Sequence, residues 1–258
     1  MKLLRRGVIV WLAIHTCLFF LGLWLLMFKC LHDLGIGIIA SAVVGYFLLL
    51  YIAFSESFSE KISMLITLGL HQAFTQRGPK IEPSYENRIA SAKTRIWVMA
   101  CRGGKFKRHF GNQFSEWAQN EKLDVRILLS DPEFPTVDNS VSYLRDLEEP
   151  RNSHSPGRSK EDIEAFVSFY KNSISGIAEI KKFKLKLARC MPAFTMVLID
   201  KEIIWGPYFV NVESSETPSF LIKQGGELYD DFEKQFIEIW ESPSYSRDVL
   251  GSLNASED

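Results

Sequence analysis

The chain has 258 residues, of which 30 are basic and 31 acidic, so its formal charge at neutral pH is −1. A charge so close to zero provides no overall field to attract nucleic acid, and any contact with a polyanion would require a local basic patch. The four cysteines show no CxxC or CxxH spacing. This excludes the usual signatures of a zinc site or a disulfide framework and suits a reducing compartment. We expect no cofactor.

Two long apolar runs dominate the start of the sequence. Residues 7–28 and 34–54 carry no Asp, Glu, Lys or Arg. About 20 residues at 1.5 Å each cross the hydrocarbon core of a bilayer, so each run is long enough to span it. The sequence therefore predicts a transmembrane helical hairpin over residues 1–54.

The basic residues beside these runs predict the orientation of the hairpin. Lys2, Arg5 and Arg6 precede the first run, whereas the connecting turn holds only Lys29. Basic residues favour the cytoplasmic side, so we expect a two-pass protein with both termini in the cytoplasm. A second span follows the first almost at once, which argues against a cleaved signal peptide.

Small and polar residues lie inside both predicted spans. Gly37, Ser41 and Gly45 recur every four positions, a pattern that lets helix backbones approach closely in lipid. They either seat the first span within one hairpin or pack one protomer on another. His15 and Thr16 lie within the first span, where an ionisable group is costly. His15 either lines a polar path or is a neutral histidine hydrogen-bonded to a neighbouring helix.

Residues 55–82 are predicted to be an amphipathic juxtamembrane helix with a linker. Apolar residues recur at helical spacing from Ser55 to Arg77, and Gly78-Pro79 would end the helix. Such a helix would lie in the membrane interface, pair with copies of itself, or continue the second span as a stalk.

Helical and strand patterns alternate in residues 83–242. Helices are predicted at residues 85–93, 110–120, 161–181 and 227–240. Strands are predicted at residues 94–101, 123–129, 184–188, 194–199, 202–205 and 219–222. This order implies an α/β domain with a mixed sheet covered by helices. The proline-containing segment 135–160 is predicted to be an exposed insertion, and residues 243–258 a flexible tail.

Several segments of this domain, read together, resemble the phospholipase D-like fold. They are the strand at residues 95–100, the segments 124–132 and 191–200, Trp205-Gly206-Pro207-Tyr208, and residues 236–240. The resemblance covers residues 83–242 and rests on pattern and order. Members with one motif per chain build their cleft from two chains, so the resemblance implies a homo-oligomer.

The resemblance also implies a degenerate active site. Family members use a histidine nucleophile, a lysine two residues later that clamps phosphate, and an aspartate seven residues after the histidine. Here these positions hold Ala193, Thr195 and Asp200. Alanine cannot attack phosphorus, and threonine supplies no cation. The downstream Gly-Ser pair and asparagine of the family correspond to Gly206-Pro207 and an out-of-register Asn211. Catalysis by the usual route is therefore expected to be absent.

One basic stretch follows the first predicted strand of the domain and contains Arg102, Lys105, Lys107 and Arg108. The end of a strand commonly receives a ligand, so this loop is a candidate contact for phosphate, nucleic acid or a partner. The alternatives are a solvated loop or one resting on anionic lipid. The histidines of the domain lie outside nucleophile and metal motifs.

A two-span anchor joined to a degenerate phospholipase D-like domain resembles membrane effectors of bacterial antiphage defence, such as the two-transmembrane effectors of retrons. The resemblance implies a toxin that disrupts the bacterial inner membrane during abortive infection, with an inactive cytoplasmic domain for sensing or partner binding. It also implies a reverse transcriptase with its RNA/DNA complex as partner, besides the lipid bilayer. The small-molecule ligand stays unknown. The alternatives are a membrane-tethered nuclease or phospholipase with a rearranged site, and a tethered binding module without toxicity.

Overall fold

The structure is a computed structural model that describes residues 2–75, 82–148, 158–174, 182–190, 194–214 and 216–250, without the side chains of residues 2–9, 30, 52–58, 82 and 84. The chain forms two compact units, Met1–Leu65 and Ile66–Asp258, which are described separately.

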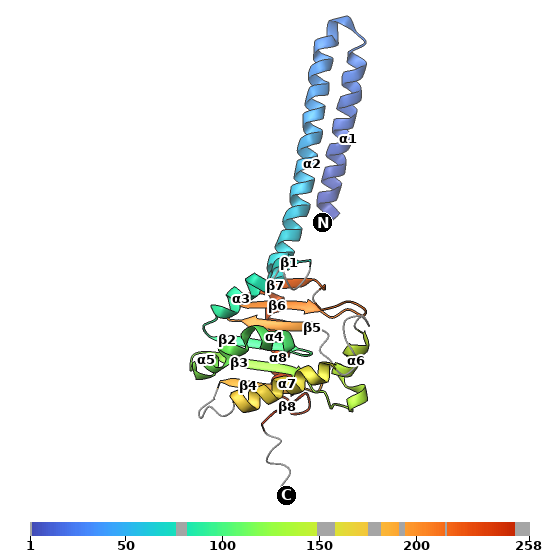
Figure 1. Ribbon diagram of the computed structural model, residues 1–258. Helices are drawn as coiled ribbons and strands as arrows, with labels where there is room; N and C mark the ends of the chain where they lie inside the picture. The colour runs from blue at the N-terminus through green and yellow to red at the C-terminus, as the bar shows by residue number, and fades with distance from the viewer. Residues whose placement is uncertain are drawn as a thin grey trace. The chain divides into compact units, whose positions relative to one another are not determined.

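The first unit consists of two helices that lie side by side (Figure 1). Helix α1 spans Lys2–Leu25, a short 3-10 turn η1 spans Lys29–Leu31, and helix α2 begins at His32 and ends at Leu68. Glycines make their contact close. A Cβ atom at Gly22 would lie 2.7 Å from Ile39 Cγ1, and one at Gly35 would lie 2.8 Å from the Gly22 carbonyl oxygen. Ala42 is fully buried between the helices.

One helix is long and apolar enough to cross a membrane. This is the stretch His32–Tyr51 of α2, with a mean hydropathy of 2.2, whereas α1 contributes the shorter apolar stretch Val10–Leu25 among residues with described side chains. The structure thus supports one helix of membrane-crossing length near the N-terminus. The first of the two predicted spans, residues 7–28, stays a prediction.

The second unit is built on an eight-stranded mixed sheet. Its strands are β1 (Leu70–Phe74), β2 (Arg95–Ala100), β3 (Asp124–Ser130), β4 (Phe183–Ala188), β5 (Phe194–Ile199), β6 (Glu202–Pro207), β7 (Ser219–Lys223) and β8 (Ser246–Asp248). Their order is β1-β7-β6-β5-β2-β3-β4-β8. Strands β2, β3 and β4 are parallel to one another, and the other neighbours are antiparallel.

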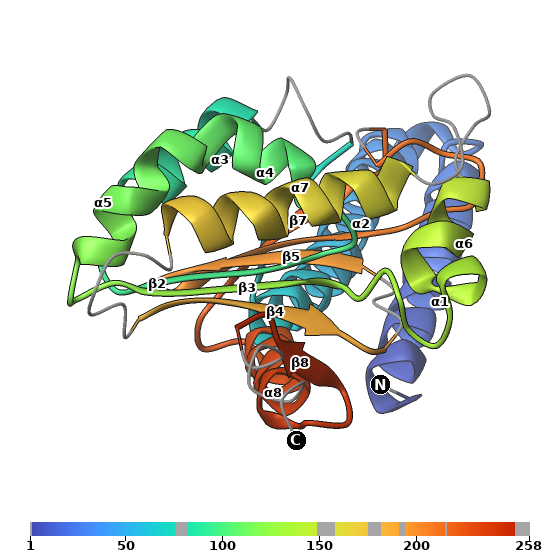
Figure 2. The same cartoon turned by 60° about the horizontal axis from the view of Figure 1, so that its bottom comes forward.

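Helices cover both faces of this sheet (Figure 2). They are α3 (Glu82–Ala90), α4 (Gly104–Phe110), α5 (Phe114–Gln119), α6 (Val141–Glu148), α7 (Arg158–Ser173) and α8 (Glu227–Glu241), with 3-10 turns η2 (Gly111–Gln113) and η3 (Val137–Asn139). Helices α3, α4, α5 and α7 lie on one face, α8 lies on the other, and α6 lies at one end (Figure 2). The predicted α/β class, a mixed sheet covered by helices, is confirmed.

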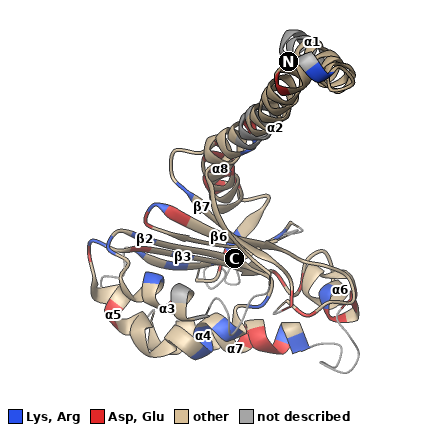
Figure 3. Ribbon diagram, turned by 90° about the horizontal axis from the view of Figure 1, so that it is seen from above, with Lys and Arg blue, Asp and Glu red and all other residues tan. Residues whose placement is uncertain are grey.

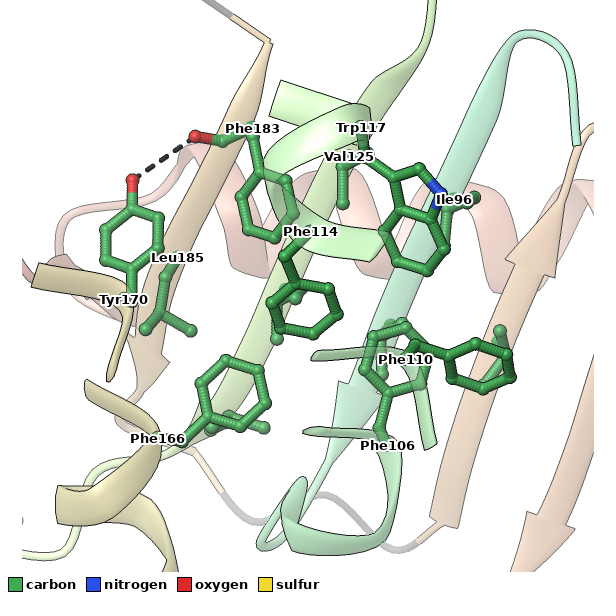
Figure 4. Packing of buried hydrophobic residues seen from close by; sticks show 14 of the residues in the cluster. Ile96, Phe106, Phe110, Phe114, Trp117, Val125, Phe166, Tyr170, Phe183 and Leu185 are labelled. Carbon is green, nitrogen blue, oxygen red and sulfur yellow. Dashed lines mark hydrogen bonds between the residues drawn. The ribbon is translucent and has the colours of Figure 1, made fainter. Parts of the chain in front are cut away.

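The alternation of side chains along the strands produces two cores. In β2, Ile96 and Val98 point to the face under α4 and α7, and Trp97 and Met99 point to α8. The first core is rich in aromatic rings (Figure 4), and Phe114 lies 5.2 to 6.0 Å from the centroids of its ring neighbours. Each fully buried phenylalanine contributes about 2 to 3 kcal/mol to folding. These rings fix α4, α5 and α7 on the sheet.

The predicted juxtamembrane helix is present as a continuation of α2, but it ends at Leu68 and does not reach Arg77. Helix α2 ends at Leu68 because Gly69 adopts a left-handed conformation with φ +76°, and residues 70–74 form the edge strand β1. A strand without β-branched residues gives little signal in the sequence, because its hydrogen bonds come from β7, far along the chain. Residues 76–81 lie outside the described residues.

Three further predictions need correction. The basic stretch is not a loop, because α4 begins at Gly104. The segment 135–160 is not a simple exposed insertion, since it forms η3, α6 and the start of α7, and buries Ser142, Arg145 and Asp146. The predicted tail contains β8, which pairs with β4. Elements α4, η3, α6 and β8 are short, so their local sequence signals are weak and tertiary contacts decide their structure.

Candidate functional site

A cleft of about 330 Å³ opens on the sheet face that carries α4 and α7. It lies where β2 and β6 end and β5 and β7 begin. Val98, Val197 and Ile204 form an aliphatic floor, and residues of α3, α4, α6, α7 and the segment after β6 form the walls. The cleft therefore joins an apolar base to a polar rim, the usual composition of a small-molecule site.

The rim of the cleft has an excess of positive charge. Its basic side chains outnumber the acidic ones five to two, and they are Arg102, Lys105, Arg108, Arg145 and Arg158 against Asp162 and Glu213. Figure 3 shows Lys and Arg on α4 and both signs of charge on α7. The near-neutral charge of the whole chain thus conceals a locally cationic site.

Helix α4 presents two of these cations on one face. Gly103, with φ +72°, turns the chain from β2 into α4, and a Cβ there would lie 2.7 Å from Leu129 Cδ2. Lys105 and Arg108 follow at i and i+3, so they point the same way. Both are exposed, and within the described part of the chain neither makes a side-chain hydrogen bond or ion pair.

Two arginines of the rim support the walls of the cleft. Arg102 lies 3.9 Å from the Asp146 carboxylate, which also accepts hydrogen bonds from Ser159 at the start of α7. Arg145 is 5% exposed and donates to the carbonyl oxygens of Phe209 (2.9 Å) and Val212 (3.1 Å). These contacts fasten α6 to α7 and to the segment after β6.

Of the four basic residues named from the sequence, the structure brings Arg102, Lys105 and Arg108 to the cleft. The prediction for Lys107 was wrong, because this residue does not line the cleft. It points to α7, where its Nζ donates to the Ala165 carbonyl oxygen at 3.3 Å and lies 6.0 Å from the Phe169 ring centroid. The reason is helical geometry, since a residue between two positions that share a face points elsewhere.

The nucleophilic and basic side chains at the cleft are constrained. Burial raises the pKa of the Cys101 thiol to about 11, so the thiol stays protonated at neutral pH. The Cys101 backbone N–H donates to the Tyr208 hydroxyl at 3.0 Å. His109 Nδ1 lies 2.9 Å from Glu86 Oε1. No group of three or more His, Cys, Asp or Glu suited to a metal ion occurs among the described residues.

The structure separates the degenerate motif positions. Thr195 lines the cleft, and its hydroxyl donates to the Met99 carbonyl oxygen at 3.2 Å. Asp200 follows the other end of β5, about 16 Å away at 3.3 Å per residue. Ala193 lies outside the described residues. Thr195 and Asp200 therefore do not meet in one site.

Asp200 anchors a turn. Its carboxylate accepts hydrogen bonds from the backbone N–H groups of Thr94 (2.8 Å), Lys93 (3.0 Å) and Arg95 (3.1 Å), and from the Thr94 hydroxyl (2.7 Å). Partial burial raises the pKa of Asp200, but these hydrogen bonds outweigh it and hold the pKa below its usual value.

The polar residues of the first unit are also placed. His15 Nδ1 lies 2.8 Å from the Trp11 carbonyl oxygen, so its partner is its own helix. A Cβ at Gly45 would overlap the His15 ring, whereas one at Gly37 would meet open space. Ser41 is exposed and donates to the Gly37 carbonyl oxygen at 2.9 Å. Gly37 and Ser41 thus lie outside the contact of α1 with α2, and Gly45 lies in it.

The Thr16 hydroxyl donates to the Leu12 carbonyl oxygen at 2.8 Å and also bonds the Tyr46 hydroxyl of α2. Thr16 therefore has partners on both helices.

Arg145, Arg158 and Tyr208 were not found as site residues from the sequence. Arg145 and Arg158 both lie in the segment 135–160, which was predicted to be an exposed insertion. One local signal was present, because Ser140 precedes α6 as an N-cap and its Oγ accepts from the Tyr143 N–H at 3.3 Å. The local sequence could not have predicted the contact of Tyr208 with Cys101, since that contact depends on the order of the strands in the sheet.

No protein-family model matches the sequence, and no curated protein matches it either. Among solved structures, TrmBL2, an archaeal chromatin protein, aligns at 12% identity and a TM-score of 0.39, over 82% of this chain and 69% of that chain. Phosphatidylserine synthase from Haemophilus influenzae Rd KW20 aligns at 11% identity and a TM-score of 0.42, over 69% of this chain. The alignment spans 38% of the synthase chain. Neither likeness assigns the chain to a family.

Proposed function

We propose that this protein is a membrane-anchored toxic effector of a bacterial antiphage defence system, in which the helical unit disrupts the inner membrane and the cleft-bearing domain controls it. The observation that carries the proposal is the pairing, in one chain, of a helix of membrane-crossing length with a cationic cleft that lacks an activated nucleophile among the described residues. The resemblance to the two-transmembrane effectors of retrons supports it.

The chemistry of the cleft favours a binding role over catalysis. A nucleophile needs a lowered pKa or an adjacent base. The Cys101 thiol instead has a raised pKa, and the Thr195 hydroxyl donates its hydrogen bond to a backbone carbonyl oxygen. His109 has Glu86 as its partner rather than a nucleophile. These contacts of Cys101, Thr195 and His109 support a site that binds a ligand rather than one that cleaves it.

The proposal includes a two-pass anchor over residues 7–28 and 34–54 with both termini in the cytoplasm. It also includes assembly of several copies, and a phospholipase D-like domain that senses the signal or binds an inhibitory partner. A reverse transcriptase with its RNA/DNA complex is the partner that the resemblance implies. Cysteine labelling from the periplasm tests the topology in a chain whose own cysteines are replaced by serine: a cysteine in place of Asp33 should react in intact cells, and one in place of Asp258 should not.

The function is tested by expressing the full chain and a variant that lacks residues 1–54, while recording membrane potential with a fluorescent dye. We expect the full chain to depolarise the cells within minutes of induction and the shortened variant to be harmless. Total DNA and phospholipid are measured in the same cells. If the shortened variant still kills while DNA or lipid is degraded, the proposal fails and a nuclease or phospholipase with a rearranged site replaces it.

A further inference from the structure

We propose that the cleft binds a small phosphate ester of nucleotide size, with the phosphate held by Lys105 and Arg108 and the rest of the molecule on the aliphatic floor. This deepens the proposed function by naming the class of ligand that the sensing domain receives. Only the regulatory consequence rests on that function, because binding itself is a property of the cleft.

The charges at the rim support the phosphate. Lys105 and Arg108 share one face of α4 without a partner in the described part of the chain, so they repel each other until an anion lies between them. Arg102 and Arg158 extend the positive rim. Phosphate suits this arrangement because guanidinium groups bind it with two parallel hydrogen bonds and ammonium groups bind it as point charges. The carboxylate of Asp162 lies against Gly104 and disfavours an anion at that point of the rim.

The floor supports an organic group on the phosphate. Val98, Val197 and Ile204 present only hydrocarbon, which a free inorganic anion would leave uncovered. Tyr85 and Tyr208 also line the cleft and add aromatic carbon to its walls, and the Arg145 guanidinium lies over the Tyr208 ring, 5.0 Å from its centroid. A volume of about 330 Å³ lies at the lower end of the range of small-molecule pockets, roughly 300 to 1,000 Å³. The cleft is thus suited to one nucleotide-sized molecule rather than to a nucleic-acid strand.

The position of the cleft suits a regulatory ligand. Its walls come from the start of α4, from α6 and α7, and from the segment after β6, which are far apart in sequence. A ligand that contacts all of these segments raises the free energy of unfolding of the folded domain. The increase grows with the logarithm of the ligand concentration divided by its Kd. Binding of the ligand would therefore raise the melting temperature of the domain.

The test is calorimetric titration of the full chain in detergent with AMP, ATP, inorganic triphosphate and glycerol 3-phosphate. The last two probes separate a nucleotide from a bare phosphate chain and from a lipid headgroup. We expect at least one phosphate ester to bind, and to bind more tightly than inorganic triphosphate. The double variant Lys105→Gln/Arg108→Gln should weaken that binding by about 100-fold or more, since each charge-assisted hydrogen bond that is lost costs roughly a factor of ten.

The matched control is Lys122→Gln/Lys184→Gln, which removes the same charge from exposed positions outside the cleft. It should keep the Kd of the unmodified chain. Thermal unfolding verifies that both variants are folded. The inference is overturned if none of the probes binds at millimolar concentration, or if both double variants bind equally well. Neither result depends on membrane injury, so failure of the inference is distinguishable from failure of the proposed function.

Discussion

At the scale of single residues, the buried carboxylate of Asp131 holds the last strand of the sheet. It is 2% exposed and accepts hydrogen bonds from Arg247 Nε (2.6 Å) and Nη2 (2.9 Å) of β8, and from Arg189 Nε (3.3 Å). Burial raises the pKa of Asp131, but the hydrogen bonds and the charge of Arg247 outweigh it and lower the pKa below its usual value.

A lowered pKa in the folded state makes stability depend on pH. The contribution of Asp131 is fully present above the pKa of the unfolded chain, about 4, and is lost as the pH falls through the folded pKa. We expect Asp131→Asn to lower the free energy of unfolding at pH 7 by about 3 kcal/mol, since it leaves Arg247 without its buried partner. Urea unfolding in detergent measures this. Glu133→Gln, which changes an exposed partner of Arg247, is the control and should cost under about 1 kcal/mol.

Asp200 should matter for stability and not for toxicity. Asp200→Ala removes the acceptor of three backbone N–H groups and should lower the melting temperature of the domain, at a cost of about 1 to 3 kcal/mol. Depolarisation per amount of folded protein should be unchanged. Lys201→Ala, at the exposed neighbouring position, should change neither. Loss of depolarisation in Asp200→Ala at normal protein level would give the aspartate a functional role and contradict this prediction.

At the scale of elements, the contact of α1 with α2 distinguishes two roles of the small residues in α2, which are packing on α1 within one chain and packing on a second copy. Gly45→Leu would drive a side chain into the His15 ring, whereas Gly37→Leu projects into open space. We expect Gly45→Leu to abolish depolarisation because it forces α1 away from α2, and Gly37→Leu to weaken it less, since it leaves that contact intact and alters only a surface open to a second copy. The dye assay with equal membrane content of each variant measures this. The reverse result, with Gly37→Leu inactive and Gly45→Leu active, would assign the activity to contacts between protomers.

The elements that were predictable from the sequence are those whose own residues decide them. Strands β2, β3 and β5 are runs of buried aliphatic side chains, and α8 has a regular apolar stripe, so their patterns suffice. The edge strands β1 and β8 depend on partners elsewhere in the chain. The basic residues of α4 were recognisable as candidates because they directly follow a clear strand in the sequence. Arg145 and Arg158 were not, because α6 and α7 reach the cleft only through the tertiary fold.

At the scale of the whole molecule, the proposed assembly is testable by mass. Gly37 and Ser41 lie on a part of α2 that α1 does not cover, so they are available to a second copy in the membrane. We expect light scattering of the chain in detergent to give the mass of a dimer or larger. A monomer mass, both for the chain alone and with its partner system, would contradict the oligomer.

The edge position of β1 also has a consequence during synthesis. Only Gly69 separates the end of α2 from β1, and the partner of Phe74 is Ser219, about 145 residues later. At roughly 5 to 20 residues per second, ribosomes need on the order of ten seconds to add that length. For this interval β1 leaves the ribosome without β7, and the sheet cannot close on that edge. The β1 edge of the sheet therefore closes only after β7 has been made, and until then β1 is an unpaired strand open to aggregation or to binding by a chaperone.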